Sequence, residues 1–69
     1  MADRRLQVFA TVARLLSFTK AAESLHMTQP AVTFQIRQLE DYFNTRLFDR
    51  THNRISLTSA GHLVKGYAD

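Results

Sequence analysis

Residues 21–40 read AAESLHMTQPAVTFQIRQLE, and this stretch decides the fold. Two adjacent alanines and Leu25 supply the apolar face of a short helix, and the small alanine side chains let a neighbouring helix approach closely. His26 begins a tight turn, since histidine is enriched among the non-glycine residues found at positive φ. Thr28 suits the N-cap of a second helix, and Pro30 fits the first turn of that helix. The pattern is typical of a helix-turn-helix.

The residues before this stretch predict a first helix over residues 4–15. Its apolar side chains recur at spacings of three and four residues and form one stripe: Leu6, Phe9, Ala10, Ala13 and Leu16. Ser17 suits the N-cap of the next helix, which holds the two alanines and Leu25 on its inner side. The chain therefore enters the helix-turn-helix from an amphipathic helix that packs against it.

The helix after the turn is expected over residues 28–43. One buried face is predicted for its four apolar residues at spacings of four, three and four: Val32, Ile36, Leu39 and Phe43. Asn44 follows as a left-handed residue that ends the helix.

Residues 47–57 predict a small hairpin, or wing. A short strand over residues 47–50, a polar turn over residues 51–54 and a return strand over residues 55–57 follow one another. Thr58 or Ser59 would cap a fourth helix. The expected fold is mainly α: a winged helix-turn-helix with three helices, a short two-stranded wing and the start of a linker helix.

Length and composition exclude several classes of protein. The 69 residues suffice for one small domain, and a chain of this size buries only about 60% of its unfolded surface. The absence of cysteine excludes disulfides and thiolate metal sites. No apolar run approaches the roughly 20 residues that span a bilayer, and the N-terminus lacks the apolar core of a secretory signal, so a cytoplasmic protein without membrane contact is expected. The net charge of +3 suits a polyanion such as nucleic acid, or a solvated basic surface.

The third predicted helix turns a second face away from its buried side, because successive residues are about 100° apart. This outward face consists of Gln29, Pro30, Thr33, Phe34 and Arg37. An amide pairs with adenine, a hydroxyl reaches base edges or phosphates, and a guanidinium binds guanine or phosphate. The apolar Pro30 and Phe34 suit thymine methyl groups. An exposed Phe34 is also compatible with a protein contact, or with an ordinary exposed apolar side chain.

The wing adds a second group of polar and basic side chains. We expect His52 and Arg54 to contact DNA, since an arginine on a hairpin can lie along the backbone and enter the adjacent minor groove. Arg50 has two interpretations. It either pairs with Glu40 and holds the wing to the third helix, which we favour, or it contacts DNA.

The ordered combination of these motifs resembles the N-terminal DNA-binding domain of LysR-type transcriptional regulators. The resemblance covers nearly the whole chain and is carried by Leu6, Phe9, SFTKAA (17–22), Leu25, TQPAVT (28–33), Ile36, LE (39–40), LF (47–48), Arg50, LT (57–58) and AG (60–61). Asn44 stands where the family commonly has glycine, and a left-handed cap tolerates asparagine. Phe34 occupies a variable position, so it is expected to tune which DNA site is read.

The resemblance implies a bacterial transcription regulator that binds duplex DNA in a sequence-specific manner. Helix 28–43 would lie in the major groove, and wing 47–57 on the backbone and minor groove. The DNA-binding unit would occupy residues 1–58, and residues 59–69 would begin a linker helix through which homodimers form. The target would be an interrupted inverted repeat.

The resemblance also implies that full-length members often form tetramers and typically bind a small-molecule co-inducer through a C-terminal effector domain. Since that domain is absent from these 69 residues, the chain is expected to be a fragment, and no cofactor is expected in it. In the fourth helix, Leu63, Val64 and Tyr67 could form the dimer seam, although Leu63 and Val64 could equally close the core of the domain.

Two other functions fit the sequence less well than DNA binding. An enzyme is disfavoured, because no pair among His26, His52 and His62 has metal-ligand spacing and no nucleophile or phosphate-loop motif is present. A winged helix used for protein docking would suit Phe34. Docking, however, does not call for a face that combines Gln29, Thr33 and Arg37.

Overall fold

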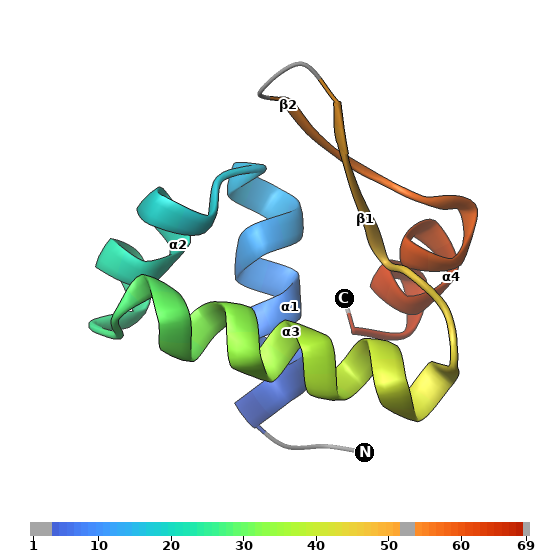
Figure 1. The fold of residues 1–69 in the computed structure, drawn as a ribbon, viewed down its shortest axis with the longest axis horizontal. Helices are drawn as coiled ribbons and strands as arrows, with labels where there is room; N and C mark the ends of the chain where they lie inside the picture. The colour runs from blue at the N-terminus through green and yellow to red at the C-terminus, as the bar shows by residue number, and fades with distance from the viewer. Residues whose placement is uncertain (1–3, 52–53, 69) are drawn as a thin grey trace.

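The computed structural model describes residues 4–51 and 54–68. Within this part of the chain, helices and strands follow in the order α1 (Arg4–Leu15), α2 (Phe18–Leu25), α3 (Gln29–Phe43), β1 (Phe48–Thr51), β2 (Arg54–Leu57) and α4 (Ser59–Ala68) (Figure 1). The first three helices, α1 to α3, pack on one another, and the β1–β2 hairpin projects from them. Helix α4 packs against α1 and β2. The predicted fold, a mainly helical winged helix-turn-helix, is confirmed.

Side-chain caps and left-handed residues set the ends of α2 and α3. The Ser17 hydroxyl oxygen accepts a hydrogen bond from the Lys20 N–H at 3.1 Å, and the Thr28 hydroxyl oxygen accepts one from the Ala31 N–H at 3.3 Å. His26 ends α2 at φ 56°, and Asn44 ends α3 at φ 55°. Both caps and both left-handed residues agree with the prediction from the sequence, so the turn geometry of the motif is local in origin.

The core lies between α1, α2 and α3, and its position corrects the stripe predicted for α1. The buried residues of α1 are Val8, Phe9, Val12 and Ala13. Leu16, which the prediction placed on the stripe, is 46% exposed, because the backbone leaves the helix there at φ 50°. The buried face of α1 is wider than a single stripe since three helices, α2, α3 and α4, surround it.

The end of α3 also differs from the prediction. Val32, Ile36 and Leu39 are buried as expected, but Phe43 is 39% exposed and packs edge-to-face on Tyr42 at 5.1 Å between ring centroids. Leu47, which is fully buried, joins the core after the chain turns at the end of the helix. The assignment of Phe43 to the buried face is therefore wrong.

The wing is a two-stranded antiparallel sheet in which Phe48 pairs with Leu57 and Thr51 with Arg54. The first strand is shifted by one residue from the predicted range 47–50, and the second begins one residue before the predicted range 55–57 and ends at Leu57 as predicted. Leu47 lies outside the ladder because its N–H donates to Glu40 Oε2 at 2.9 Å and its carbonyl accepts from the Thr58 N–H at 3.1 Å.

The start of α4 closes the domain around Leu47. Thr58 rather than Ser59 is the N-cap, because its hydroxyl oxygen accepts a hydrogen bond from the Gly61 N–H at 3.0 Å. The O–H of the same hydroxyl donates to the Arg46 carbonyl at 2.7 Å. A Cβ added to Gly61 would overlap the Leu47 carbonyl oxygen, so only glycine lets α4 approach this closely.

The structure decides between the alternatives left open for the apolar residues of α4. Val64 is buried in the core, whereas Leu63 is 70% exposed and Tyr67 is 89% exposed. Val64 therefore closes the core of the domain, and Leu63 and Tyr67 remain on the outer side of the helix.

Candidate nucleic-acid interface

The exposed face of α3 carries a shallow depression lined by the five residues predicted for it: Gln29, Pro30, Thr33, Phe34 and Arg37. Phe34 is 58% exposed, so its ring stands on the surface rather than in the core. The structure thus brings these five side chains together on one side of one helix.

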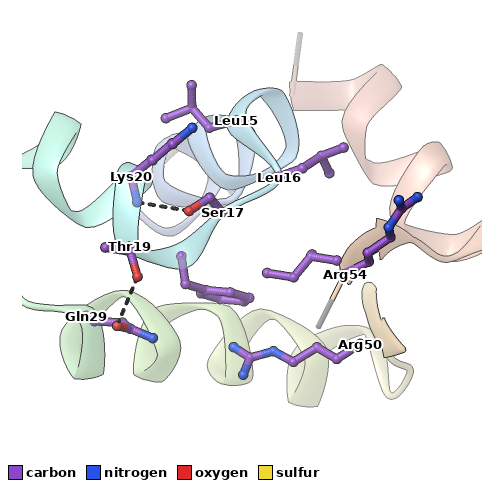
Figure 2. A pocket seen from close by; sticks show the side chains of 10 residues that line it. Leu15, Leu16, Ser17, Thr19, Lys20, Gln29, Arg50 and Arg54 are labelled. Carbon is purple, nitrogen blue, oxygen red and sulfur yellow. Dashed lines mark hydrogen bonds between the residues drawn. The ribbon is translucent and has the colours of Figure 1, made fainter. Parts of the chain in front are cut away.

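Gln29 is held by a neighbouring helix. The Thr19 hydroxyl of α2 donates a hydrogen bond to Gln29 Oε1 at 3.3 Å, and the amide nitrogen of Gln29 points away from Thr19 (Figure 2). The amide is therefore oriented before any ligand arrives, with its donor group directed along the surface of α3.

A second depression lies between the start of α2 and the wing (Figure 2). Its charged lining residues are all cations: Lys20 from α2, and Arg50 and Arg54 from the wing. Ser17, Thr19 and Gln29 supply polar groups beside them. The charge of this lining favours an anion, since it includes three cationic residues and no carboxylate among its described residues, although the charged ends of the three side chains point in different directions (Figure 2).

A third depression, between α3 and the wing, joins the other two. Gln29 lines all three depressions, Thr33 and Arg37 line two, and Arg50 also lines two. We refer to the residues that line the three depressions as the α3–wing face. Glu40 is the acidic residue among the described lining residues, and it is already engaged: its Oε2 accepts the Leu47 N–H and lies 3.8 Å from Arg46 Nε.

The favoured pairing of Arg50 with Glu40 is wrong. Arg46 occupies that place, and the guanidinium carbon of Arg50 lies 4.4 Å from the centroid of the Phe18 ring. The reason is the register of β1. Arg50 is two residues after Phe48, so both side chains leave the strand on the side that faces Phe18.

The contribution of α2 to this face is not predicted from the sequence. The pattern places Lys20 on the outer side of the helix and Ser17 at its cap, but it connects neither residue to a binding surface. The N-cap at Ser17 could have indicated that α2 contributes to an anion-binding surface, because the N-terminus of a helix carries partial positive charge. Arg54 lines this face, and its contact with DNA stays a prediction. His52, the remaining predicted residue, lies outside the described residues.

Metal-binding clusters and membrane-spanning helices are both lacking in the described part of the chain. Within residues 4–51 and 54–68, no three histidine, cysteine or acidic side chains are grouped so that they could hold a metal ion. None of the helices in these ranges has the length and apolar character needed to cross a membrane.

Comparison with known sequences gives a consistent set of relatives. The model of the family described as "Bacterial regulatory helix-turn-helix protein, lysR family" matches residues 4–62. The RuBisCO operon transcriptional regulator of Allochromatium vinosum is 51% identical over 65 residues, which are 94% of this chain and 22% of that protein. The HTH-type transcriptional regulator CfxR of Cupriavidus necator is 52% identical over 65 residues, 94% of this chain and 20% of that protein. The chain therefore spans about a fifth of the length of these curated relatives.

Solved structures of the same fold agree with these sequences. A LysR-family transcriptional regulator from Eggerthella lenta superposes with a TM-score of 0.92 at 40% identity, over 97% of this chain and 96% of that one. The CbnR DNA-binding domain in complex with DNA superposes with a TM-score of 0.91 at 38% identity, over 99% of this chain and 78% of that one. The BenM DNA-binding domain in complex with catB site 1 DNA superposes with a TM-score of 0.91 at 37% identity, over 99% of this chain and 76% of that one. Sequence and fold together establish that the chain belongs to the lysR family of bacterial regulatory helix-turn-helix proteins.

Proposed function

We propose that this chain binds duplex DNA in a sequence-specific manner, as the DNA-reading part of a bacterial transcription regulator. The single observation that carries the proposal is the α3–wing face, on which an exposed helix face continues into a cluster of cations. An α-helix fits the major groove, and the wing then lies on the backbone and the adjacent minor groove.

The residues of α3 divide into base-reading and backbone-binding groups by their chemistry. Gln29 suits adenine, since an amide both donates and accepts, and Arg37 suits guanine or a phosphate. Thr33 reaches base edges or phosphates. Pro30 and Phe34 offer apolar contact to thymine methyl groups. On the wing, Arg54 is assigned to the backbone or the minor groove, and His52 is proposed there on sequence grounds.

Solved relatives support this assignment. The CbnR and BenM DNA-binding domains were crystallised with DNA, and they share 38% and 37% identity with nearly all of this chain. The named relatives are transcription regulators, so we assign no catalytic activity to the chain and place it in the cytoplasm, where bacterial DNA lies.

The exposed apolar residues of α4 support a homodimer. Leu63 and Tyr67 are four residues apart, so they lie on one side of the helix and form an apolar strip with no covering element among the described residues. We therefore assign residues 59–69 to the start of a linker helix that pairs with a second copy, and residues 1–58 to the DNA-binding unit. Two copies related by a two-fold axis would read an interrupted inverted repeat.

The rest of the proposal concerns a longer protein. The curated relatives are about five times the length of this chain, so a full-length protein has room for an effector domain. We propose that this domain binds a small-molecule co-inducer and that the full-length protein forms a tetramer.

The test is titration of a selected duplex with the wild-type chain and with Thr33→Ala and Arg37→Ala, read by fluorescence anisotropy. Loss of a good base or phosphate contact should weaken binding by about tenfold for Arg37→Ala and by less for Thr33→Ala. Thr11→Ala is the matched control, because it removes the same hydroxyl from α1, where Thr11 bonds the Gln7 carbonyl. If no duplex binds and both variants keep a protein partner, the chain is a docking module instead.

A further inference from the structure

We propose that Arg50 binds a DNA phosphate at the junction of α2, α3 and the wing, and that Phe18 is the positioning residue that holds it there. The inference rests on the proposed DNA binding and adds a contact to it. It departs from the structural role expected for Arg50 from the sequence, because the Glu40 carboxylate that would have neutralised it is occupied by Arg46 and the Leu47 N–H.

The Arg50 guanidinium lies against an aromatic ring of the core. Its carbon lies 4.4 Å from the centroid of the Phe18 ring, within the ~6 Å range of a cation–π contact. Phe18 is only 6% exposed, and its ring packs edge-on against the Phe48 ring, with 5.9 Å between the ring centroids. Phe48 in turn lies 5.3 Å from Phe9 in the core. A mobile surface cation is thereby attached to the rigid centre of the domain.

The contact with Phe18 leaves N–H donors of Arg50 available. A guanidinium has five such donors, and among the described residues Arg50 makes no hydrogen bond or ion pair with any of them. A phosphate accepts two such donors in parallel, which makes arginine well suited to bidentate binding. The contact with Phe18 therefore positions Arg50 while its donors remain available to an anion.

The residues around Arg50 favour an anion bound to its guanidinium, because other cations and the residues proposed to bind DNA lie beside it. Arg50 lines both the depression with Lys20 and Arg54 and the depression with Arg37 and Arg46. In Figure 2 the side chain of Arg50 lies below Ser17, and its guanidinium points toward Gln29 of α3. A DNA strand that follows α3 toward the wing would pass over this point, so a phosphate is the anion we assign to it.

A purely structural role predicts a different outcome. If Arg50 only ties the wing to α2, its replacement alters stability and leaves the number of neutralised phosphates unchanged. The two roles separate in the slope of log K against log salt concentration, whose magnitude decreases by about 0.9 for each phosphate of B-DNA that the protein no longer neutralises.

The first experiment measures that slope for the 69-residue chain on a duplex enriched from a random library. Arg50→Gln should weaken binding about tenfold and lower the magnitude of the slope by about 0.9 per bound copy. Arg50→Lys, which keeps the charge, should retain the slope. Arg14→Gln is the control, because Arg14 is exposed on α1 outside the three depressions and the same charge is removed. Thermal melts without DNA establish that each variant is folded.

The second experiment tests the positioning role of Phe18. Phe18→Leu keeps an apolar side chain in the core but removes the ring face, and it should weaken binding about threefold with an unchanged slope, since the cation is retained. In the Arg50→Gln background the same change should have no further effect on DNA affinity. Additive losses in the double variant would show that Phe18 acts through the core alone and would overturn its positioning role.

The outcomes separate this inference from the proposed function. A wild-type chain that enriches no duplex contradicts DNA binding itself. A wild-type chain that binds its duplex while Arg50→Gln keeps the full slope overturns only the phosphate contact of Arg50. Equal decreases in slope for Arg50→Gln and Arg14→Gln would likewise overturn it, because they would reflect net charge and not a local contact.

Discussion

At the scale of single residues, the left-handed backbone of His26 and Asn44 sets the directions in which α3 begins and ends. His26 has φ 56° and Asn44 has φ 55°, and each closes one helix so that the chain can turn to the next element. Such angles crowd a Cβ against the neighbouring carbonyl and cost roughly 1–2 kcal/mol for an ordinary residue. The direction of the recognition helix therefore depends on residues that tolerate this conformation.

His26 provides a direct test of that dependence. His26→Val should lower the free energy of unfolding by about 1–2 kcal/mol, because a β-branched side chain is strained at positive φ. His26→Gly removes the Cβ and should cost much less. Urea denaturation of both variants decides the matter, and equal losses for valine and glycine would show that the histidine side chain, not the backbone angle, matters here.

Phe34 is the residue that we propose senses base identity through an apolar contact. If its exposed ring packs on a thymine methyl, replacing that thymine by uracil should weaken wild-type binding about threefold, as expected when one buried methyl group is removed. Phe34→Ala should bind the two duplexes equally. Anisotropy titrations of the four combinations measure this coupling, and a uniform loss over all sequences would instead mark Phe34 as a structural residue.

At the scale of elements, the packing of α4 against Leu47 positions the wing relative to the helices. The Leu47 carbonyl accepts from the Thr58 N–H, and Gly61 lies directly against the same carbonyl. Any side chain at position 61 would push α4 away from the start of β1. This packing connects the helix assigned to dimerisation with the strand that carries Arg50.

The two glycines of α4 make a matched pair for testing this packing. Gly61→Ala should destabilise the domain by roughly 1–3 kcal/mol, since the added methyl meets backbone that cannot move aside easily. Gly66→Ala has open space around its Cβ and should be neutral or stabilise by up to about 1 kcal/mol. Thermal unfolding separates the two, and a tolerated Gly61→Ala would contradict the close packing of α4 on Leu47.

The same elements show what the sequence could and could not predict. The bounds of α1, the caps at Ser17 and Thr28 and the outward side of α3 follow from local rules, and all were predicted. The strand offset at Leu47 was not, because it arises from hydrogen bonds to Glu40 and Thr58, which are distant in sequence. For the same reason the contact of Arg50 with the Phe18 ring was not predicted, since it depends on how the wing packs against α2.

At the scale of the whole molecule, we assign different roles to two surfaces, the α3–wing face and the exposed strip of α4. The first combines cations with the side chains that we propose read bases, and the second consists of Leu63 and Tyr67. If α4 pairs two copies, each reads one half-site, and the dimer gains affinity from binding both half-sites at once.

Removing the apolar strip of α4 should therefore lower the affinity for a complete inverted repeat more than the affinity for a single half-site. Leu63→Glu combined with Tyr67→Glu should lower affinity for an inverted repeat at least tenfold, or about 1.4 kcal/mol, and leave half-site affinity nearly unchanged. Both residues are exposed, so the fold should be retained. Sedimentation of the free chain and titration of the two duplexes provide the measurement, and equal losses on both would argue against pairing through α4.

The most direct test of the central claim is selection of duplexes from a randomised library by the wild-type chain, followed by titration of the winners against scrambled DNA. Sequence-specific binding through α3 predicts an enriched motif, bound at least roughly 10³-fold more tightly than scrambled duplex and arranged as an interrupted inverted repeat. Failure to enrich any motif, with only weak binding that salt abolishes equally for all sequences, would contradict it.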